Sequence, residues 1–343
     1  MSDNLRLAAL GLAALVILVV AGLMFGQRYL VYSDDGLRLE LPFGKEEEQK
    51  PLDPGDISVV IRPAGSQSEQ PGQSVEEVPE EAVFAACRLP LSAVLDGTAA
   101  DELKRLGATA LILDMKDEEG KLAWKSEQTL AAQLGMNAVG EGINEALAQW
   151  NEGEVYTVAR VCCFRDNFLP YQRNDLALRA SYGNWRDELG LRWLNPDSEG
   201  ARTYLAKLCG ELAKLGFDEI LLECPAFPTL GNRESIVQSG SYTTGDFSAT
   251  VRAFLDQVNR ELEPYDTALA IRVGEDVLTG ADVISGLTAA MLEDGADRLW
   301  MSGDGEQLLG LLEKAGIQEG DKRLVTVVDT IPETPDSPCA LLN

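Results

Sequence analysis

A helix and a strand follow each other in EGARTYLAKLCGELAKLGFDEILLE, residues 199–223. Apolar residues recur at helical spacing over 199–215, Gly216 is suited to end a helix, and the run within 219–223 is almost continuously apolar. Continuous apolar character is typical of a parallel strand that is covered on both faces. This stretch therefore predicts one α/β unit of a parallel sheet.

The same alternation of helical stretches and short apolar runs extends from about residue 84 to the C-terminus. Further helices are expected over 99–106, 247–262 and 307–315. Seven or eight such units favour an α/β fold of the (β/α)8 TIM-type barrel class over an open doubly wound sheet, which the spacing also allows. The predicted strands are Phe84–Leu89, Ala110–Met115, Val155–Phe164, Glu219–Glu223, Ala268–Val273, Arg298–Met301, Leu324–Val328 and Cys339–Leu342.

Charge and composition exclude several classes of function. The chain has 343 residues, a formal net charge of −27 and no histidine. Such acidity repels nucleic-acid phosphates. Without histidine, Ser-His-Asp and Cys-His nucleophile pairs and His-ligated zinc are excluded. No G-x-G-x-x-G motif follows an early strand and no G-x-x-x-x-G-K motif is present. We therefore predict no nucleic-acid partner, no metal and no cofactor.

An uncharged run rich in Leu, Ala and Val, residues 7–26, lies between Arg6 and Arg28. At about 1.5 Å per residue, a helix over this run would be roughly 30 Å long, which matches the hydrocarbon core of a bilayer. A cleaved signal peptide is the alternative, but the run is long for its apolar region and no A-x-A site follows. We predict that residues 1–28 form a cytoplasmic stub and a single-pass transmembrane anchor in the cell membrane.

Residues 29–81 separate this anchor from the barrel domain, which we place over 82–343. A short hairpin is expected between the alternating segment 36–43 and the β-branched run 57–61. Residues 44–81 are rich in Gly, Pro, Ser, Gln and Glu, which predicts a flexible spacer. Long domains that follow an anchor translocate largely regardless of flanking charge, so we expect an extracytoplasmic barrel domain.

In a barrel of this kind, functional side chains gather at the C-terminal ends of the strands. Without histidine, two carboxylates facing each other across the barrel mouth are the most plausible acid and base, and they are the machinery of glycoside hydrolysis. The polar residues that end or follow the predicted strands are Asp114, Lys116, Asp117, Arg160, Arg165, Asp166, Glu223, Arg272, Glu275, Asp276, Asp304 and Asp329.

Four segments resemble DUF4015, an uncharacterised bacterial family of predicted glycoside hydrolases with a TIM-type barrel. They occur in the family's order at similar spacing, and the resemblance covers roughly residue 84 to the C-terminus. The family's strand-two motif, I-D-V-K-D, is matched by Asp114, Lys116 and Asp117, and its strand-three motif, I-A-R-I-V-V-F-K-D, by Arg160 and Asp166 among others. The segments are LILDMKDEE (111–119), VARVCCFRD (158–166), WLNP (193–196) and GFDEILLECPAFP (216–228).

The sequence departs from the family at strand four, where the family usually reads F-D-E-I-Q-F-D-Y-I-R-F-P. Glu223 replaces the Asp of that motif, Cys224 replaces the Tyr, and Ala226 replaces the Arg. Asn195 also stands where the family often has Asp. The acid is kept with a longer reach, but two hydrogen-bond donors that could orient a sugar are lost. The resemblance therefore implies the fold more firmly than the activity.

The strand ends and the resemblance together give the candidate site. Asp114 and Glu223 are the predicted catalytic pair, and the predicted substrate-binding residues are Arg160, Asp166, Lys116, Trp193 and Arg272. Each residue has a structural alternative. Asp114 could pair with Lys116 at the barrel rim, Arg160 could form a core ion pair, and Trp193 could pack in a core or lid instead of stacking on sugar. Cys224 lacks an activating histidine.

Two functions remain open from the sequence. The first is a membrane-anchored protein that resembles a glycoside hydrolase and acts on a cell-envelope or extracellular polysaccharide through paired carboxylates. The alternative is a catalytically degenerate barrel that serves as a carbohydrate-binding or envelope-scaffolding module. The altered strand-four motif is the feature that separates them.

Overall fold

A computed structural model of the chain describes residues 30–33, 36–39, 83–137 and 139–342. The chain divides into two units, residues 1–76 and 77–343. In the part that the structure describes, no helix has both the length and the apolar character needed to cross a membrane. The predicted anchor over 7–26 and the predicted spacer over 44–81 lie outside the described residues.

The first unit contains a short antiparallel hairpin. Strand β1 (Leu30–Ser33) pairs with β2 (Gly36–Leu39), and Leu30 lies opposite Leu39. The expected strand at the start of 36–43 is present, and within the described residues it pairs with the segment 30–33. Its expected pairing with 57–61 lies outside the described residues.

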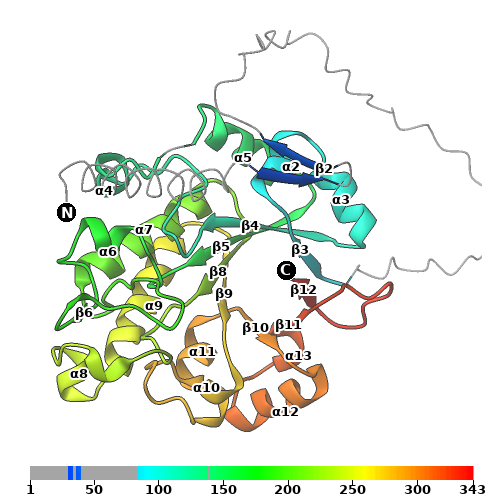
Figure 1. The fold of residues 1–343 in the computed structure, drawn as a ribbon. Coiled ribbons are helices and arrows are strands. Elements are labelled where there is room, and N and C mark those ends of the chain that lie inside the picture. Colours follow the sequence, from blue (N-terminus) through cyan, green and yellow to red (C-terminus); the bar gives the residue numbers. More distant parts are fainter. Residues whose placement is uncertain (1–29, 34–35, 40–82, 138, 343) are drawn as a thin grey trace, which may run out of the picture. The chain divides into compact units, whose positions relative to one another are not determined.

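The second unit is built on eight parallel strands that close into a barrel, with the helices outside the ring (Figure 1). The strands follow one another around the ring in sequence order, and the last pairs with the first, Cys339 lying opposite Ala85. This closing pair confirms the predicted (β/α)8 barrel over the open sheet. The strands are β3 (Ala85–Arg88), β4 (Ala110–Lys116), β5 (Tyr156–Cys162), β8 (Glu219–Glu223), β9 (Ala268–Arg272), β10 (Arg298–Ser302), β11 (Leu324–Val328) and β12 (Cys339–Leu341).

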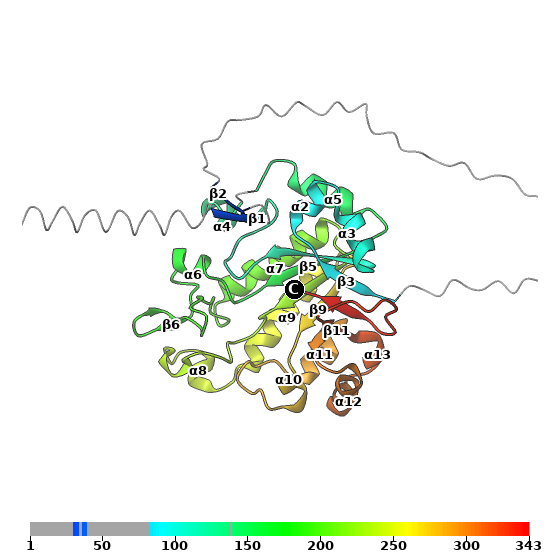
Figure 2. The same ribbon diagram turned by 45° about the vertical axis from the view of Figure 1, so that its right-hand side comes forward.

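Side-chain hydrogen bonds mark the N-terminal ends of two of the helices that surround the strands. Ser198 caps helix α7 (Glu199–Lys214) through its side chain, which accepts from the backbone N–H of Ala201, and Asp304 caps α12 (Gly305–Ala315) in the same way. The turned view shows the helices surrounding the strands (Figure 2). The helices are α2 (Leu91–Leu95), α3 (Ala99–Leu106), α4 (Thr129–Gln133), α5 (Ile143–Asn151), α6 (Leu169–Gln172), α7 (Glu199–Lys214), α8 (Ser241–Thr244), α9 (Ser248–Leu262), α10 (Glu275–Thr279), α11 (Ala289–Gly295), α12 (Gly305–Ala315) and α13 (Gly320–Arg323).

Two apolar layers hold the barrel together. The outer layer lies between the strands and helices such as α7 and α9, which pack against each other. The inner layer fills the barrel interior with one or two residues from each strand, so the barrel has a packed core beneath its mouth. Its buried members are Ala86, Ala110, Ile112, Val158, Leu221, Ala270, Trp300, Val325, Ala340 and Leu342.

Candidate functional site

Strand alternation places a set of polar side chains at the top of the barrel interior. Residues two positions apart on a strand point to the same face. Ile112 belongs to the inner layer, so Asp114 also points inward, and the same step leads from Val158 to Arg160. We call the residues one step above the inner layer the mouth layer. They are Arg88, Asp114, Arg160, Glu223, Arg272, Ser302 and Val327.

Arg160 bridges the two predicted catalytic carboxylates. Its Nη1 donates to Asp114 Oδ1 at 2.9 Å, and its Nη2 donates to Glu223 Oε2 in a short ion pair. The Arg160 side chain is 13% exposed. Burial lowers the pKa of Arg160, but the hydrogen bonds and charges of Glu223 and Asp114 outweigh burial, so the pKa rises above its ordinary value. The guanidinium therefore remains charged between the two acids.

Further arginines lie on both sides of this bridge. Arg88 donates from Nε to Asp114 Oδ2 at 2.9 Å and from Nη1 to the carbonyl of Leu342 at 2.9 Å. Arg272 Nε lies 3.8 Å from Glu223 Oε1. The mouth layer thus carries alternating charges across five neighbouring strands, with a guanidinium at each end of the series.

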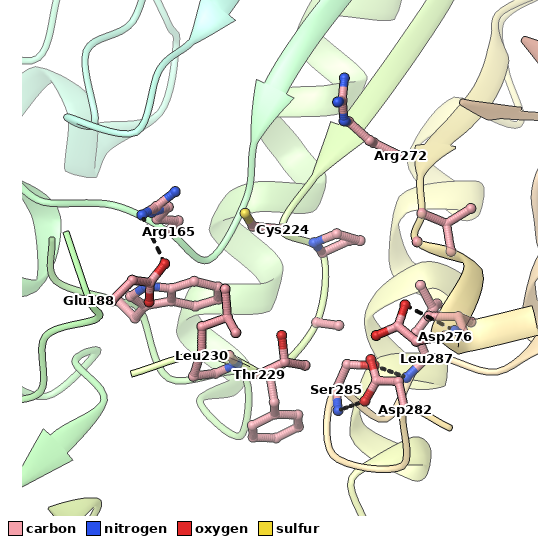
Figure 3. A pocket seen from close by; sticks show the side chains of 18 residues that line it. Arg165, Glu188, Cys224, Thr229, Leu230, Arg272, Asp276, Asp282, Ser285 and Leu287 are labelled. Atoms are coloured by element: carbon pink, nitrogen blue, oxygen red, sulfur yellow. Dashed lines mark hydrogen bonds and ion pairs between the residues drawn. The ribbon is translucent and has the colours of Figure 1, made fainter. Parts of the chain in front are cut away.

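Three adjoining cavities open at this end of the barrel, and Arg272 contributes to the lining of each. The axial cavity, about 680 Å³, is lined by Arg88, Arg160, Glu223 and Asp329 among others. A smaller cavity of about 360 Å³, the bridging cavity, adjoins Glu223 and Cys224. The loop cavity, about 250 Å³, lies between the loops that follow β8 and β9 (Figure 3). An open space therefore lies above the ion-paired carboxylates.

Cys224 turns the chain out of β8 and into the wall of the loop cavity. Its backbone has a φ of 48°, a left-handed conformation that is uncommon for a residue other than glycine. Its carbonyl accepts from the N–H of Phe164 at 3.1 Å, which ties this turn to the end of β5. A hydrogen bond to Cys224, together with burial, raises the pKa of the Cys162 thiol, so Cys162 is not a thiolate at neutral pH.

Two predicted substrate-binding residues lie beneath the site instead of lining it. Lys116 and Asp166 are completely buried and form an ion pair at 2.9 Å. Lys116 Nζ also donates to the carbonyl of Cys162 at 2.7 Å, and Asp166 Oδ1 accepts from the N–H of Leu169 at 2.8 Å. Burial leaves neither side chain accessible to a ligand, so the pair acts by holding the loops that follow β4 and β5.

Trp193 is also mostly enclosed, and its contacts are structural. Its indole Nε1 donates to Asp187 Oδ2 at 3.0 Å, and its ring meets Trp185 edge to face at 6.4 Å. Arg165 Nε donates to the same Asp187 oxygen at 2.8 Å. Trp193 and Arg165 line the loop cavity, where Figure 3 shows Arg165 and Arg272 on opposite sides of Cys224. Trp193 therefore supports the cavity wall and offers little surface for stacking.

Sequence reasoning missed several residues of this region, among them Arg88, Ser302 and Asp187. Arg88 ends β3 two positions after the inner-layer residue Ala86, so strand alternation contained the signal that places it in the mouth layer. Asp187 organises the loop beside the cavity by accepting from Arg165 and Trp193, yet it lies in the long excursion after β5, where no periodicity marks it. Among the described residues, no group of three or more acidic or cysteine side chains is arranged to hold a metal ion.

Comparison with known proteins gives a family and a fold. The model of the family DUF4015, described as "Putative glycosyl hydrolase domain", matches residues 97–283. No curated protein matches the chain in sequence.

Several solved structures resemble the chain. A hypothetical protein from Ruminiclostridium thermocellum ATCC 27405 is 23% identical with a TM-score of 0.45, over 54% of this chain and 96% of that one. The GH20 exo β-N-acetylglucosaminidase from Vibrio harveyi is 11% identical with a TM-score of 0.50, over 72% of this chain and 41% of the enzyme. The glycoside hydrolase domain of PgaB (BpsB) from Bordetella bronchiseptica is 13% identical with a TM-score of 0.45, over 72% of this chain and 84% of that domain. The likeness to the Vibrio enzyme shows a shared fold.

Proposed function

Because the chain belongs to the DUF4015 family of glycosyl hydrolase domains, we propose that it binds a polysaccharide or oligosaccharide at the barrel mouth. The axial cavity above Arg160 is the site that we assign to this ligand. Ligands of such barrels bind at the C-terminal ends of the strands, where this cavity lies. Among the functions that the sequence left open, the geometry supports best a carbohydrate-binding module that does not use Asp114 and Glu223 as an acid and base pair.

The Arg160 bridge is the observation that carries this choice. In glycoside hydrolysis one carboxyl must hold a proton for the leaving oxygen, and the sugar or a water must fit between the two acids. Both oxygens of Asp114 instead accept from guanidinium N–H groups, and so does Oε2 of Glu223. The space that a substrate would need between the acids is therefore held by Arg160.

Hydrolysis is a second candidate because one carboxylate oxygen has no close partner among the residues that the structure describes. Glu223 Oε1 lies 3.8 Å from Arg272, beyond hydrogen-bonding distance, and Glu223 lines the axial and bridging cavities. A carboxylate with one open oxygen could attack a sugar or activate a water. In that case Asp114 would need to exchange its arginine partners for substrate.

Binding and hydrolysis can be separated with the full chain. Affinity electrophoresis through gels that contain cell-envelope or extracellular polysaccharides measures binding, and release of reducing ends from the same polysaccharides measures cleavage. We expect retardation without release of reducing ends. Release that is lost in Glu223→Gln and kept in the exposed control Glu313→Gln would establish the hydrolase. Absence of retardation by every polysaccharide would refute saccharide binding.

We also propose that the barrel acts outside the cytoplasm, held to the cell membrane by residues 7–26. The support is the length and apolar character of that run and the spacer-like composition of 44–81. Protease added to intact cells should therefore release a soluble barrel fragment, because exposed chain rich in Pro, Gly and Ser is readily cleaved. Cleavage only after cell lysis would reverse the proposed topology.

A further inference from the structure

Guanidinium groups are concentrated at the mouth of a chain whose net charge is −27. Arg88, Arg160 and Arg272 line the axial cavity, and Arg165 lines the adjoining loop cavity. The long-range field of so acidic a chain repels anions. A local group of arginines in a cavity therefore indicates short-range recognition of negative charge, for which the planar guanidinium is well suited.

Three of these arginines have partners that hold them in place. Arg88 and Arg160 both donate to Asp114 at 2.9 Å. Arg165 donates to the almost fully buried Asp187 at 2.8 Å. These side chains shape the positive wall of the site, and each of them is held by at least one hydrogen bond to a carboxylate.

Among the described residues, Arg272 is the mouth arginine that makes no hydrogen bond to a carboxylate. Its Nη2 is 3.3 Å from Ser302 Oγ, a long hydrogen bond, and its Nε is 3.8 Å from Glu223. The side chain is 34% exposed and lines all three cavities. Because a guanidinium has five N–H donors in a planar fork, most donors of Arg272 are available to a ligand.

On the side of the axial and bridging cavities, the surroundings of Arg272 offer charge and hydrogen bonds but no aromatic surface. Within the described part of the chain, neither the axial nor the bridging cavity has an aromatic side chain in its lining. A neutral sugar ring would find no aromatic face to pack against, so polar contacts must supply recognition. The carboxylates of the axial cavity are Glu223, which is held by Arg160, and Asp329 at its exposed rim.

Acidic side chains lie on the other side of Arg272, in the loop cavity. Asp276 and Asp282 line it, and their Oδ1 atoms accept from nearby backbone N–H groups, which keeps them in place. Glu188 adds a third carboxylate to this lining. Repulsion from these groups disfavours an anion in the loop cavity. A bound anion is therefore expected on the axial side of Arg272, near Ser302.

We propose that Arg272, assisted by Ser302, binds an anionic substituent of the saccharide in the axial cavity. This inference rests on the proposed saccharide-binding function and names its substrate class: sugars that carry a carboxylate or a phosphate ester. Both groups present paired oxygen acceptors that match the arginine fork in a bidentate contact.

Calorimetric titration of the full chain with four hexasaccharides tests the proposal. Hexagalacturonate carries carboxylates, maltohexaose 6-phosphate carries a phosphate ester, maltohexaose is neutral, and the glucosamine hexamer is cationic. We expect at least one anionic hexamer to bind about tenfold or more tightly than maltohexaose, and the preferred one identifies the carboxylate or the phosphate source. Arg272→Gln should abolish this preference, and Arg272→Lys should retain part of it.

Arg252→Gln is the matched control, because Arg252 is exposed, pairs with Asp294 at 3.3 Å and lines none of the three cavities. It should bind as the wild type does. Equal affinity for neutral and anionic hexamers, or a preference that survives Arg272→Gln, would overturn the anionic substrate class and leave saccharide binding intact. Binding of none of the four would instead count against the proposed function. If Arg272→Gln does not fold, two measurements still test the proposal. They are the ratio of wild-type affinities for the anionic hexamers and maltohexaose, and the change of that ratio in Arg272→Lys.

Discussion

The two ends of the barrel each hold a glutamate of the same strand, β8, and the two glutamates differ in how completely they are partnered. At the N-terminal end, Glu219 is fully buried and accepts from Tyr156, Arg298 and Trp300 at 2.8–3.1 Å. At the C-terminal end, Glu223 is 15% exposed, and within the described part of the chain its Oε1 has only Arg272 nearby, at 3.8 Å. Both point into the barrel, because each lies two positions from the inner-layer residue Leu221.

This difference indicates that the contacts of Glu219 stabilise the fold, whereas Glu223 and its neighbours can also bind a ligand. A buried carboxylate with every oxygen engaged makes a closed network, whose loss leaves several groups unsatisfied. A partly open carboxylate beside an underused arginine leaves hydrogen-bonding capacity for a ligand. The arrangement follows the general division of such barrels, in which the N-terminal face provides stability and the C-terminal face provides function.

The largest expected effect is the loss of stability on removing Glu219. Glu219→Ala leaves the buried Trp300 indole N–H and the Arg298 guanidinium without their acceptor, and breaking a buried pair in this way costs about 3–5 kcal/mol. Glu223→Ala should cost less, about 1.5–3 kcal/mol, because Arg160 loses one charged hydrogen bond but keeps its bond to Asp114. Denaturant unfolding of both variants measures the two losses. Equal losses would remove the distinction between the two ends.

Much of the fold was predictable from sequence because the strands are short apolar runs between helical stretches. All eight strands lie where the apolar runs predicted them, within a few residues. The last predicted strand is present over Cys339–Leu341, and it closes the barrel. The partner of the hairpin strand at 36–39 was not predictable in the same way, because alternation identifies a strand but not its neighbour.

The candidate site was less predictable because it depends on register and on one irregularity. Asp114 lies opposite Arg160, so their contact is a property of how β4 and β5 align, which neither segment encodes alone. Asp114 and Lys116 are two positions apart, so regular strand alternation would place both side chains on one face, where the sequence allowed them to pair. The register shifts between these two residues, and Lys116 is buried against β5 carbonyls and Asp166. A local break in alternation thus moved a predicted binding residue beneath the site.

A second prediction uses pH to probe the closed cluster. Burial raises the pKa of Glu219, and this outweighs the lowering by Arg298 and by the hydrogen bond from Trp300. The folded chain therefore holds the Glu219 proton more tightly than the unfolded chain, whose carboxyl pKa is about 4.3. The stabilising contribution of the Glu219 carboxyl is therefore fully present below the unfolded-state pKa. It is lost as the pH rises through the pKa of Glu219 in the folded chain.

Glu219→Gln removes this titration. The free energy of unfolding of the wild type minus that of Glu219→Gln should fall as pH rises above about 4.3, by at most about 1.4 kcal/mol per pH unit within the titration window. Denaturant unfolding at a series of pH values measures this difference. A difference that is constant with pH, or that grows, would show that the paired cation and the hydrogen bonds outweigh burial at Glu219.

The smallest expected effect on stability belongs to Arg272, and a second arginine provides its matched comparison. Arg298 at the closed end donates to Glu219 at 3.0 Å and lies over the rings of Phe84 and Tyr156, 4.2 and 5.2 Å from their centroids. Arg298→Gln should therefore cost about 2–3 kcal/mol, since it removes cation–π contacts and leaves a buried carboxylate without its cation.

Arg272→Gln should change the free energy of unfolding by no more than about 0.5 kcal/mol, the usual range for substitutions away from packed or paired groups. The reason is that, with the residues that the structure describes, Arg272 makes one long hydrogen bond to Ser302 and a distant contact with Glu223. Unfolding curves of the two glutamine variants, measured side by side, test the contrast between the two ends. Equal losses of unfolding free energy in Arg272→Gln and Arg298→Gln would show that Arg272 stabilises the C-terminal end of the barrel as Arg298 stabilises the N-terminal end. The donors of Arg272 would then be used by the fold and would not be free for a ligand.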